Sequence, residues 1–134
     1  MRVLVCATEY YPYGSGIANV AYNVVRELEE MGVECTVCSP SGPDIKLGDP
    51  THIRKYGILG MLEYWNQVSR YFRSNDYDVV WLHSPLFLGK NPFNKYLVTM
   101  HITLSGVSNR KLSDSLFLQC YKHLSSMIES YCLN

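Results

Sequence analysis

The stretch RVLVCATEYYPYGSGIANVAYNVVRELEEMGVECTVCS, residues 2–39, decides the fold of this chain. Its first residues, 2–8, form an apolar run that is typical of a short strand buried on both faces. A second strand-like run occupies residues 33–39, and between the two runs the apolar residues recur with the spacing of a helix. The stripe that this helix is expected to bury consists of Ile17, Val20, Ala21, Val24, Leu28 and Met31. Gly32 follows as a C-terminal cap, so the segment predicts two parallel strands joined by a right-handed helical crossover.

The rest of the chain continues the same alternation. Further elements are expected at residues 58–72 (helix), 79–83 and 96–102 (strands) and from about 113 onward (helix). Residues 40–50 are rich in proline, glycine and aspartate and predict a loop, and residues 84–95 form an irregular connection. The pattern predicts an α/β fold, a Rossmann-like parallel sheet of at least four strands with helices on both faces.

Length and composition limit the class of protein. The chain has 134 residues, enough for one domain with a sizeable core and too few for two. Apolar residues make up 47% and charged residues 18%, which favours a globular protein over a disordered one. Lysine plus arginine and aspartate plus glutamate are both 12, so no net charge directs the chain to nucleic acid or to an anionic bilayer.

The cysteines indicate a reducing compartment. There are five, an odd number, and the apolar run after Arg2 is too short for a secretory signal. We therefore expect free thiols and a cytoplasmic location. In the strand-like run at 33–39, alternation places Cys35 and Cys38 on opposite faces, which favours buried thiols over a redox or metal pair. We expect no metal site.

Polar residues follow three of the predicted strands. Gly14 and Gly16 follow the first strand and precede a helix, His83 and Ser84 end the third, and His101 ends the fourth. Because ligands bind beyond the carboxyl ends of parallel strands, these residues are candidates for one site. Free amides at the helix N-terminus suit an anion, and glycine allows a phosphate or sugar to approach the backbone. The alternative is that the two glycines only form a turn that reverses the chain. The residues between the first strand and the helix do not by themselves decide between a binding site and a turn.

Two common nucleotide-binding motifs do not fit the segment that contains Gly14 and Gly16. GSGIAN resembles the start of a dinucleotide fingerprint, but Asn19 replaces its third glycine and the second strand ends in Ser39-Pro40 without an acid for the ribose. A P-loop requires lysine and a hydroxyl residue after its second glycine, where this chain has Ile17 and Ala18.

Three segments in order resemble family 4 glycosyltransferases of the GT-B fold. RVLVCATEYYPYGSGIANVAYNVVRELEEMGVECTVCSP resembles the opening of those enzymes. NDYDVVWLHSPL is similar to their P-D-V-V-H-V-H-S-P segment, with Trp81 in the place of the first histidine. KYLVTMHITLSG is similar to their P-x-V-x-T-x-H-G segment. The resemblance covers nearly the whole chain.

This resemblance implies a Rossmann-like N-terminal domain that holds mainly the acceptor, across a cleft from a second domain that binds a nucleotide-diphosphate sugar. It implies transfer with retention of configuration and without a divalent metal or another cofactor. The E-x7-E motif of the second domain is absent, since no two glutamates lie eight apart. We therefore expect residues 1–134 to be one acceptor-side domain whose C-terminal donor domain is missing or is supplied by a partner chain, and to be inactive alone.

The resemblance also implies roles for individual residues. His101 would lie beside the transferred sugar as the catalytic residue, Gly14 and Gly16 would line the cleft, and His83 and Ser84 would contact the acceptor. Tyr13 would stack on a sugar, although tyrosines that only cover a loop are commoner, and His101 has the alternative of a hydrogen-bonded histidine at a strand end. The acceptor is a glycan, a lipid or a small molecule. Relatives that use lipid acceptors dock on membranes, which leaves peripheral contact with the inner face of the membrane open.

A second class of function stays open from the sequence. A non-catalytic Rossmann-like module that binds a nucleotide, a sugar or another protein would show the same strand and helix pattern. An E-x7-E motif in a second domain would favour the enzyme.

Overall fold

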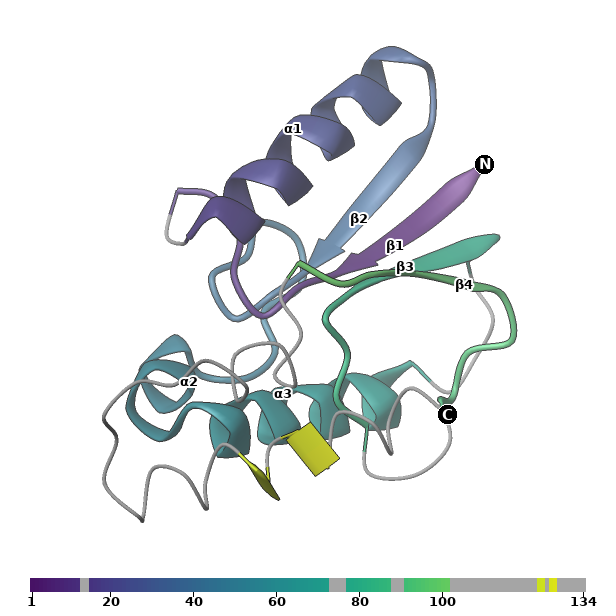
Figure 1. Ribbon diagram of the computed structural model, residues 1–134. Helices are drawn as coiled ribbons and strands as arrows, with labels where there is room; N and C mark the ends of the chain where they lie inside the picture. The colour runs from purple at the N-terminus through teal and green to yellow at the C-terminus, as the bar shows by residue number, and fades with distance from the viewer. Residues whose placement is uncertain (13–14, 73–76, 88–90, 102–122, 125, 128–134) are drawn as a thin grey trace.

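A four-stranded parallel sheet forms the centre of the molecule (Figure 1). The computed structural model describes residues 1–12, 15–72, 77–87, 91–101, 123, 124, 126 and 127. The strands are β1 (Arg2–Cys6), β2 (Glu34–Cys38), β3 (Val79–His83) and β4 (Tyr96–Thr99). Their order across the sheet is β2-β1-β3-β4, and all neighbours are parallel. The predicted α/β class and the parallel sheet are confirmed.

Helices cover both faces of the sheet, as Figure 1 shows. Alternation along β1 sends Val3 and Val5 to the face under helix α1 (Gly16–Glu30), where they pack with residues such as Val25. Leu4 and Cys6 point to the opposite face and pack with helix α3 (Ile58–Tyr71), whose core residues are Ile58, Leu62, Tyr64, Trp65 and Val68. The sheet is therefore buried on both faces near β1, which explains why the first strand is apolar throughout.

Local contacts define both ends of α1. The Ser15 hydroxyl accepts a hydrogen bond from the Ile17 amide at 3.3 Å and caps the N-terminus. At the other end Gly32 has φ 81°, and its amide donates to the Glu29 carbonyl at 2.9 Å. Gly32 is the predicted C-terminal turn, and glycine suits it because this left-handed conformation strains a side chain.

The chain between β2 and α3 contains a short helix that the sequence pattern does not predict. Asp49 caps the N-terminus of this helix, α2 (Pro50–Tyr56), because its Oδ1 accepts a hydrogen bond from the Thr51 amide at 2.7 Å. α2 presses closely on α3, because a Cβ added to Gly60 would lie 2.6 Å from the His52 carbonyl oxygen. The expected loop at 40–50 is otherwise irregular, apart from a bridge between Cys38 and Ile45.

Several boundaries differ from those expected. β1 and β2 each end before the predicted residue, and β4 ends at Thr99 rather than 102, so His101 lies just beyond its strand. The expected α1 stripe is also partly wrong, because α1 buries Ala18, Ala21 and Val25 while Val20 and Val24 are 45% and 37% exposed. The expected helix from about 113 lies mostly outside the described residues. None of the helices in the described part of the chain is long and apolar enough to cross a bilayer.

Candidate functional site

Two histidines meet at the carboxyl edge of the sheet. His83 is the last residue of β3, and His101 follows the end of β4 by two residues. His83 Nδ1 and His101 Nε2 lie 2.8 Å apart, a hydrogen-bond distance, and the two rings are nearly parallel at a centroid separation of 5.1 Å. The ring of Trp81 packs against that of His83 at a centroid distance of 4.2 Å, and Trp81 Nε1 donates a hydrogen bond to Thr99 Oγ1 at 2.8 Å. The parallel pairing of β3 and β4 thus brings together residues 18 positions apart.

Burial keeps His83 uncharged. Only 1% of its surface is exposed, and the loss of water, followed by the charge of His101, lowers the pKa of His83 to about 4. Its Nε2 is buried and finds no hydrogen-bond partner among the described residues. At neutral pH His83 therefore acts as a neutral imidazole that orients the ring of His101 through one hydrogen bond.

The N-terminus of α1 lies at the same edge and on the same face of the sheet. Trp81 and His83 are two positions apart on β3, so both lie on the face that α1 covers. α1 starts at Gly16, in the connection that follows the carboxyl end of β1 (Figure 1). A Cβ added at Gly16 would meet no heavy atom within 4 Å in the described part of the chain, so the space in front of this residue is open.

Side chains of the connection between β1 and α1 form contacts that stabilise this connection. Glu9 Oε2 accepts a hydrogen bond from the Ser15 amide at 3.1 Å, so with the Ile17 amide that Ser15 caps, two amides at this helix end are already occupied. Tyr10 is buried, which raises the pKa of its hydroxyl to about 12, and Tyr11 stacks on Tyr22 of α1 at a centroid distance of 4.6 Å. Packing therefore accounts for two of the three tyrosines in this segment.

The structure places four of the six predicted site residues. Gly16, His83 and His101 lie at the carboxyl edge, as described above. Ser84 extends the β3–β4 pairing, since its amide donates to the Thr99 carbonyl at 2.9 Å, and it has a φ of 50°. Gly14 and Tyr13 lie outside the described residues. The hydrogen bonds of Glu9 with the Ser15 amide and of Thr99 with Trp81 were not predicted, because no regular helix or strand spacing links these residues.

The prediction that Cys35 and Cys38 face opposite sides of the sheet is confirmed, although Cys35 is half-buried rather than buried. Cys35 contributes to the core under α1, whereas Cys38 is buried on the α3 side, so the two point to opposite faces. Cys38 instead neighbours Cys6 in the adjacent strand, and both are free thiols. Burial raises the pKa of the Cys6 thiol, which makes the thiol a structural rather than a reactive group.

Comparison with known proteins agrees with the fold. No curated protein matches the chain in sequence. The model of the family described as Glycosyltransferase Family 4 matches residues 14–127, which is most of the chain and spans α1, both sheet-covering layers and the two histidines. This match agrees with the Rossmann-like parallel sheet, and the chain therefore belongs to glycosyltransferase family 4, in which it corresponds to the N-terminal domain.

Proposed function

We propose that this chain is the acceptor-side domain of a retaining glycosyltransferase that moves a sugar from a nucleotide-diphosphate sugar to an acceptor hydroxyl. The family match over residues 14–127 is the observation that carries the proposal. A second Rossmann-like domain, on the same polypeptide or on a partner chain, binds the nucleotide. The proposal needs no divalent metal, because amides and cations of the two domains can meet the charge on the leaving diphosphate.

The histidine pair supports a role for His101 beside the transferred sugar. A half-buried imidazole next to a neutral, buried His83 is held in one orientation, and a group held in this way can donate a hydrogen bond to the sugar as charge develops. His83 acts through His101 and is a positioning residue. Gly14 and Gly16 would let the diphosphate or the acceptor approach the backbone, and the open space in front of Gly16 agrees with this role. Tyr13 and Ser84 would complete the acceptor side.

The test is sugar transfer by the polypeptide or complex that contains this domain together with the donor-binding domain. Each of several nucleotide sugars is offered, and turnover is detected by mass spectrometry. We expect His101→Asn to lower kcat by about a hundredfold, within the range that one general acid–base or charge-stabilising group contributes.

His123→Asn is the matched control, because His123 is also a histidine but is exposed and lies far along the chain from both strands. Equal activity of His101→Asn and the unmodified enzyme would overturn the role of His101. Absence of transfer from every nucleotide sugar by the intact enzyme would instead favour a non-catalytic binding module.

A further inference from the structure

A pocket with two cationic side chains lies at the carboxyl end of β2, away from the histidine pair. Its volume is about 390 Å³, which suits a small organic ligand or a phosphorylated group. We call it the basic pocket, and it is lined by Pro40, Ser41, Lys46, Pro50, Thr51 and Arg54. The loop after β2 forms one wall and the first turns of α2 form the other.

The charges in the basic pocket favour an anion. Neither Lys46 nor Arg54 forms an ion pair with any residue in the described part of the chain. The two carboxylates of this segment are held by backbone amides, Asp44 by the Val37 amide and Asp49 by the Thr51 amide, each at 2.7 Å. An ammonium and a guanidinium that form no ion pair with any described residue are groups that bind phosphate strongly.

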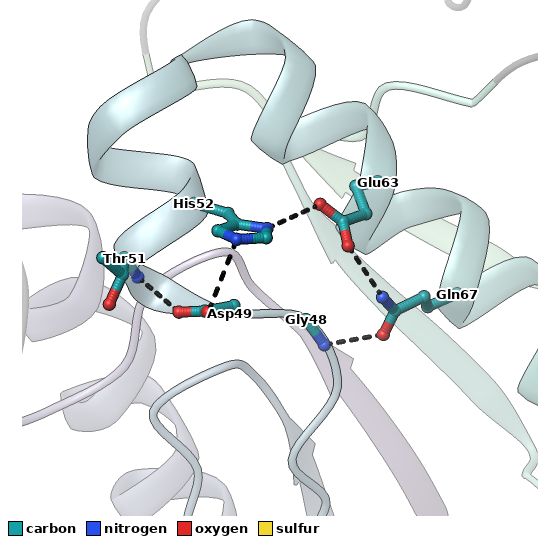
Figure 2. Close-up of polar contacts among 6 residues, drawn as sticks. All are labelled: Gly48, Asp49, Thr51, His52, Glu63 and Gln67. Atoms are coloured by element: carbon teal, nitrogen blue, oxygen red, sulfur yellow. Dashed lines mark hydrogen bonds and ion pairs between the residues drawn. The ribbon is translucent and has the colours of Figure 1, made fainter.

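Polar contacts fix the wall that α2 provides, as Figure 2 shows. His52 of α2 contacts Glu63 of α3 at 3.1 Å and Asp49 at 3.8 Å. Gln67 of α3 accepts a hydrogen bond from the Gly48 amide at 2.8 Å and donates to Glu63 at 3.4 Å. Together with the close approach at Gly60, these contacts fix the backbone of α2 against α3, and with it the positions from which Thr51 and Arg54 extend into the basic pocket.

The other wall connects the basic pocket to the joint that precedes Gly16. Ser41 Oγ accepts a hydrogen bond from the Tyr10 amide and donates one to the Tyr10 carbonyl, both at 3.1 Å. β2 and β4 are separated by two strands in the sheet order, so the carboxyl ends of these strands lie about 14 Å apart. A ligand that occupies the basic pocket and also reaches His101 must therefore be extended.

We propose that the basic pocket binds a phosphate group of the acceptor, while the hydroxyl that receives the sugar lies near His101. The identity of this ligand as the acceptor rests on the proposed function, whereas the phosphate chemistry rests on Lys46 and Arg54 alone. A soluble phosphate ester and the head group of a phospholipid both supply that chemistry.

The experiment measures binding to the 134-residue chain without any nucleotide sugar. One arm titrates glycerol 1-phosphate and follows amide shifts by NMR. The other arm measures cosedimentation with vesicles of phosphatidylcholine that contain or lack phosphatidylglycerol. We expect saturable binding in at least one arm and a loss of affinity of about tenfold in the Lys46→Gln/Arg54→Gln double variant.

Lys55→Gln is the matched control, because Lys55 is an exposed cation of the same helix that does not line the basic pocket. Its affinity should stay within about twofold of the unmodified chain, as expected for an exposed charge outside the site. Binding in the first arm identifies a soluble ester, and binding in the second arm alone identifies a lipid head group. No saturable binding in either arm, or an equal loss in Lys55→Gln, overturns the proposal and leaves the transfer assay unaffected.

Discussion

At the scale of single residues, His83 is the side chain whose chemistry depends most on the fold. In an unfolded chain its pKa is near 6.5, and burial with His101 as its neighbour lowers this pKa to about 4 in the folded state. Between these two pH values His83 is mostly protonated in the unfolded state and mostly neutral in the folded state. The stability contributed by neutral His83 is therefore complete above pH 6.5 and is lost as the pH falls toward 4.

This shift predicts a pH-dependent free energy of unfolding. We expect His83 to account for a loss on the order of 3 kcal/mol between pH 7 and pH 4. Urea unfolding at intervals across this range, compared with His83→Gln, measures the contribution. The variant should show a flatter dependence on pH, and parallel curves for both proteins would contradict the assigned pKa.

Gly16 allows a second prediction about a single residue. Its backbone is helical, and an added Cβ meets no described atom, so Gly16→Ala should leave the free energy of unfolding unchanged or raise it by up to about 1 kcal/mol. If a ligand approaches this backbone, the same variant should lower the kcat/KM of the enzyme that contains the domain by about tenfold or more. Urea unfolding and steady-state kinetics measure the two effects. Unaltered kinetics in a stable variant would argue against the glycine role.

At the scale of elements, α1 carries more apolar surface than the described structure buries. Val25 is 4% exposed and packs on the sheet, whereas Val24 is 37% exposed. Val24 belongs to an apolar groove of about 260 Å³, lined by Met1, Val3, Val24, Leu28, Val79, Trp81 and Leu97. The predicted stripe included Val24 but not Val25, because both spacings fit a helical period and only the packing of α1 over β1 selects between them.

These two neighbouring valines form a matched pair for mutation. Val25→Ala removes buried methyl groups and should lower the free energy of unfolding by about 1–3 kcal/mol. Val24→Ala removes the same atoms from a largely exposed position and should cost less than about 0.5 kcal/mol. Urea unfolding at pH 7 measures both. A larger effect at Val24 than at Val25 would mean that α1 is rotated relative to the orientation described here.

At the scale of the whole molecule, the proposed function assigns to this domain one side of a catalytic cleft. Transfer needs donor and acceptor in near-attack geometry, and oriented binding supplies roughly 7–11 kcal/mol of barrier reduction. We therefore expect the 134 residues alone to fold and to bind nucleotide sugar weakly, without measurable transfer. Product analysis with a panel of nucleotide sugars checks this. Turnover by the isolated chain would require a complete active site within residues 1–134.

The sequence by itself determined the elements and their order. Apolar runs and the helical period are local properties, so β1, α1, β2, α3, β3 and β4 were predictable from neighbouring residues, as was the turn at Gly32. Alternation along the strand at residues 34–38 also predicted that Cys35 and Cys38 face opposite sides of the sheet. Helix α2 escaped prediction because it is short, exposed and stabilised mainly by its contacts with α3.

Only the tertiary structure decided which side chains meet. The hydrogen bond between His83 and His101 arises from the pairing of β3 with β4, and the low pKa of His83 arises from burial that no local pattern encodes. Lys46 and Arg54 likewise line the same pocket only because packing fixes α2 against α3. Sequence periodicity depends only on neighbouring residues along the chain. The protonation state, the burial and the contacts of a side chain within a site depend on segments that packing brings together.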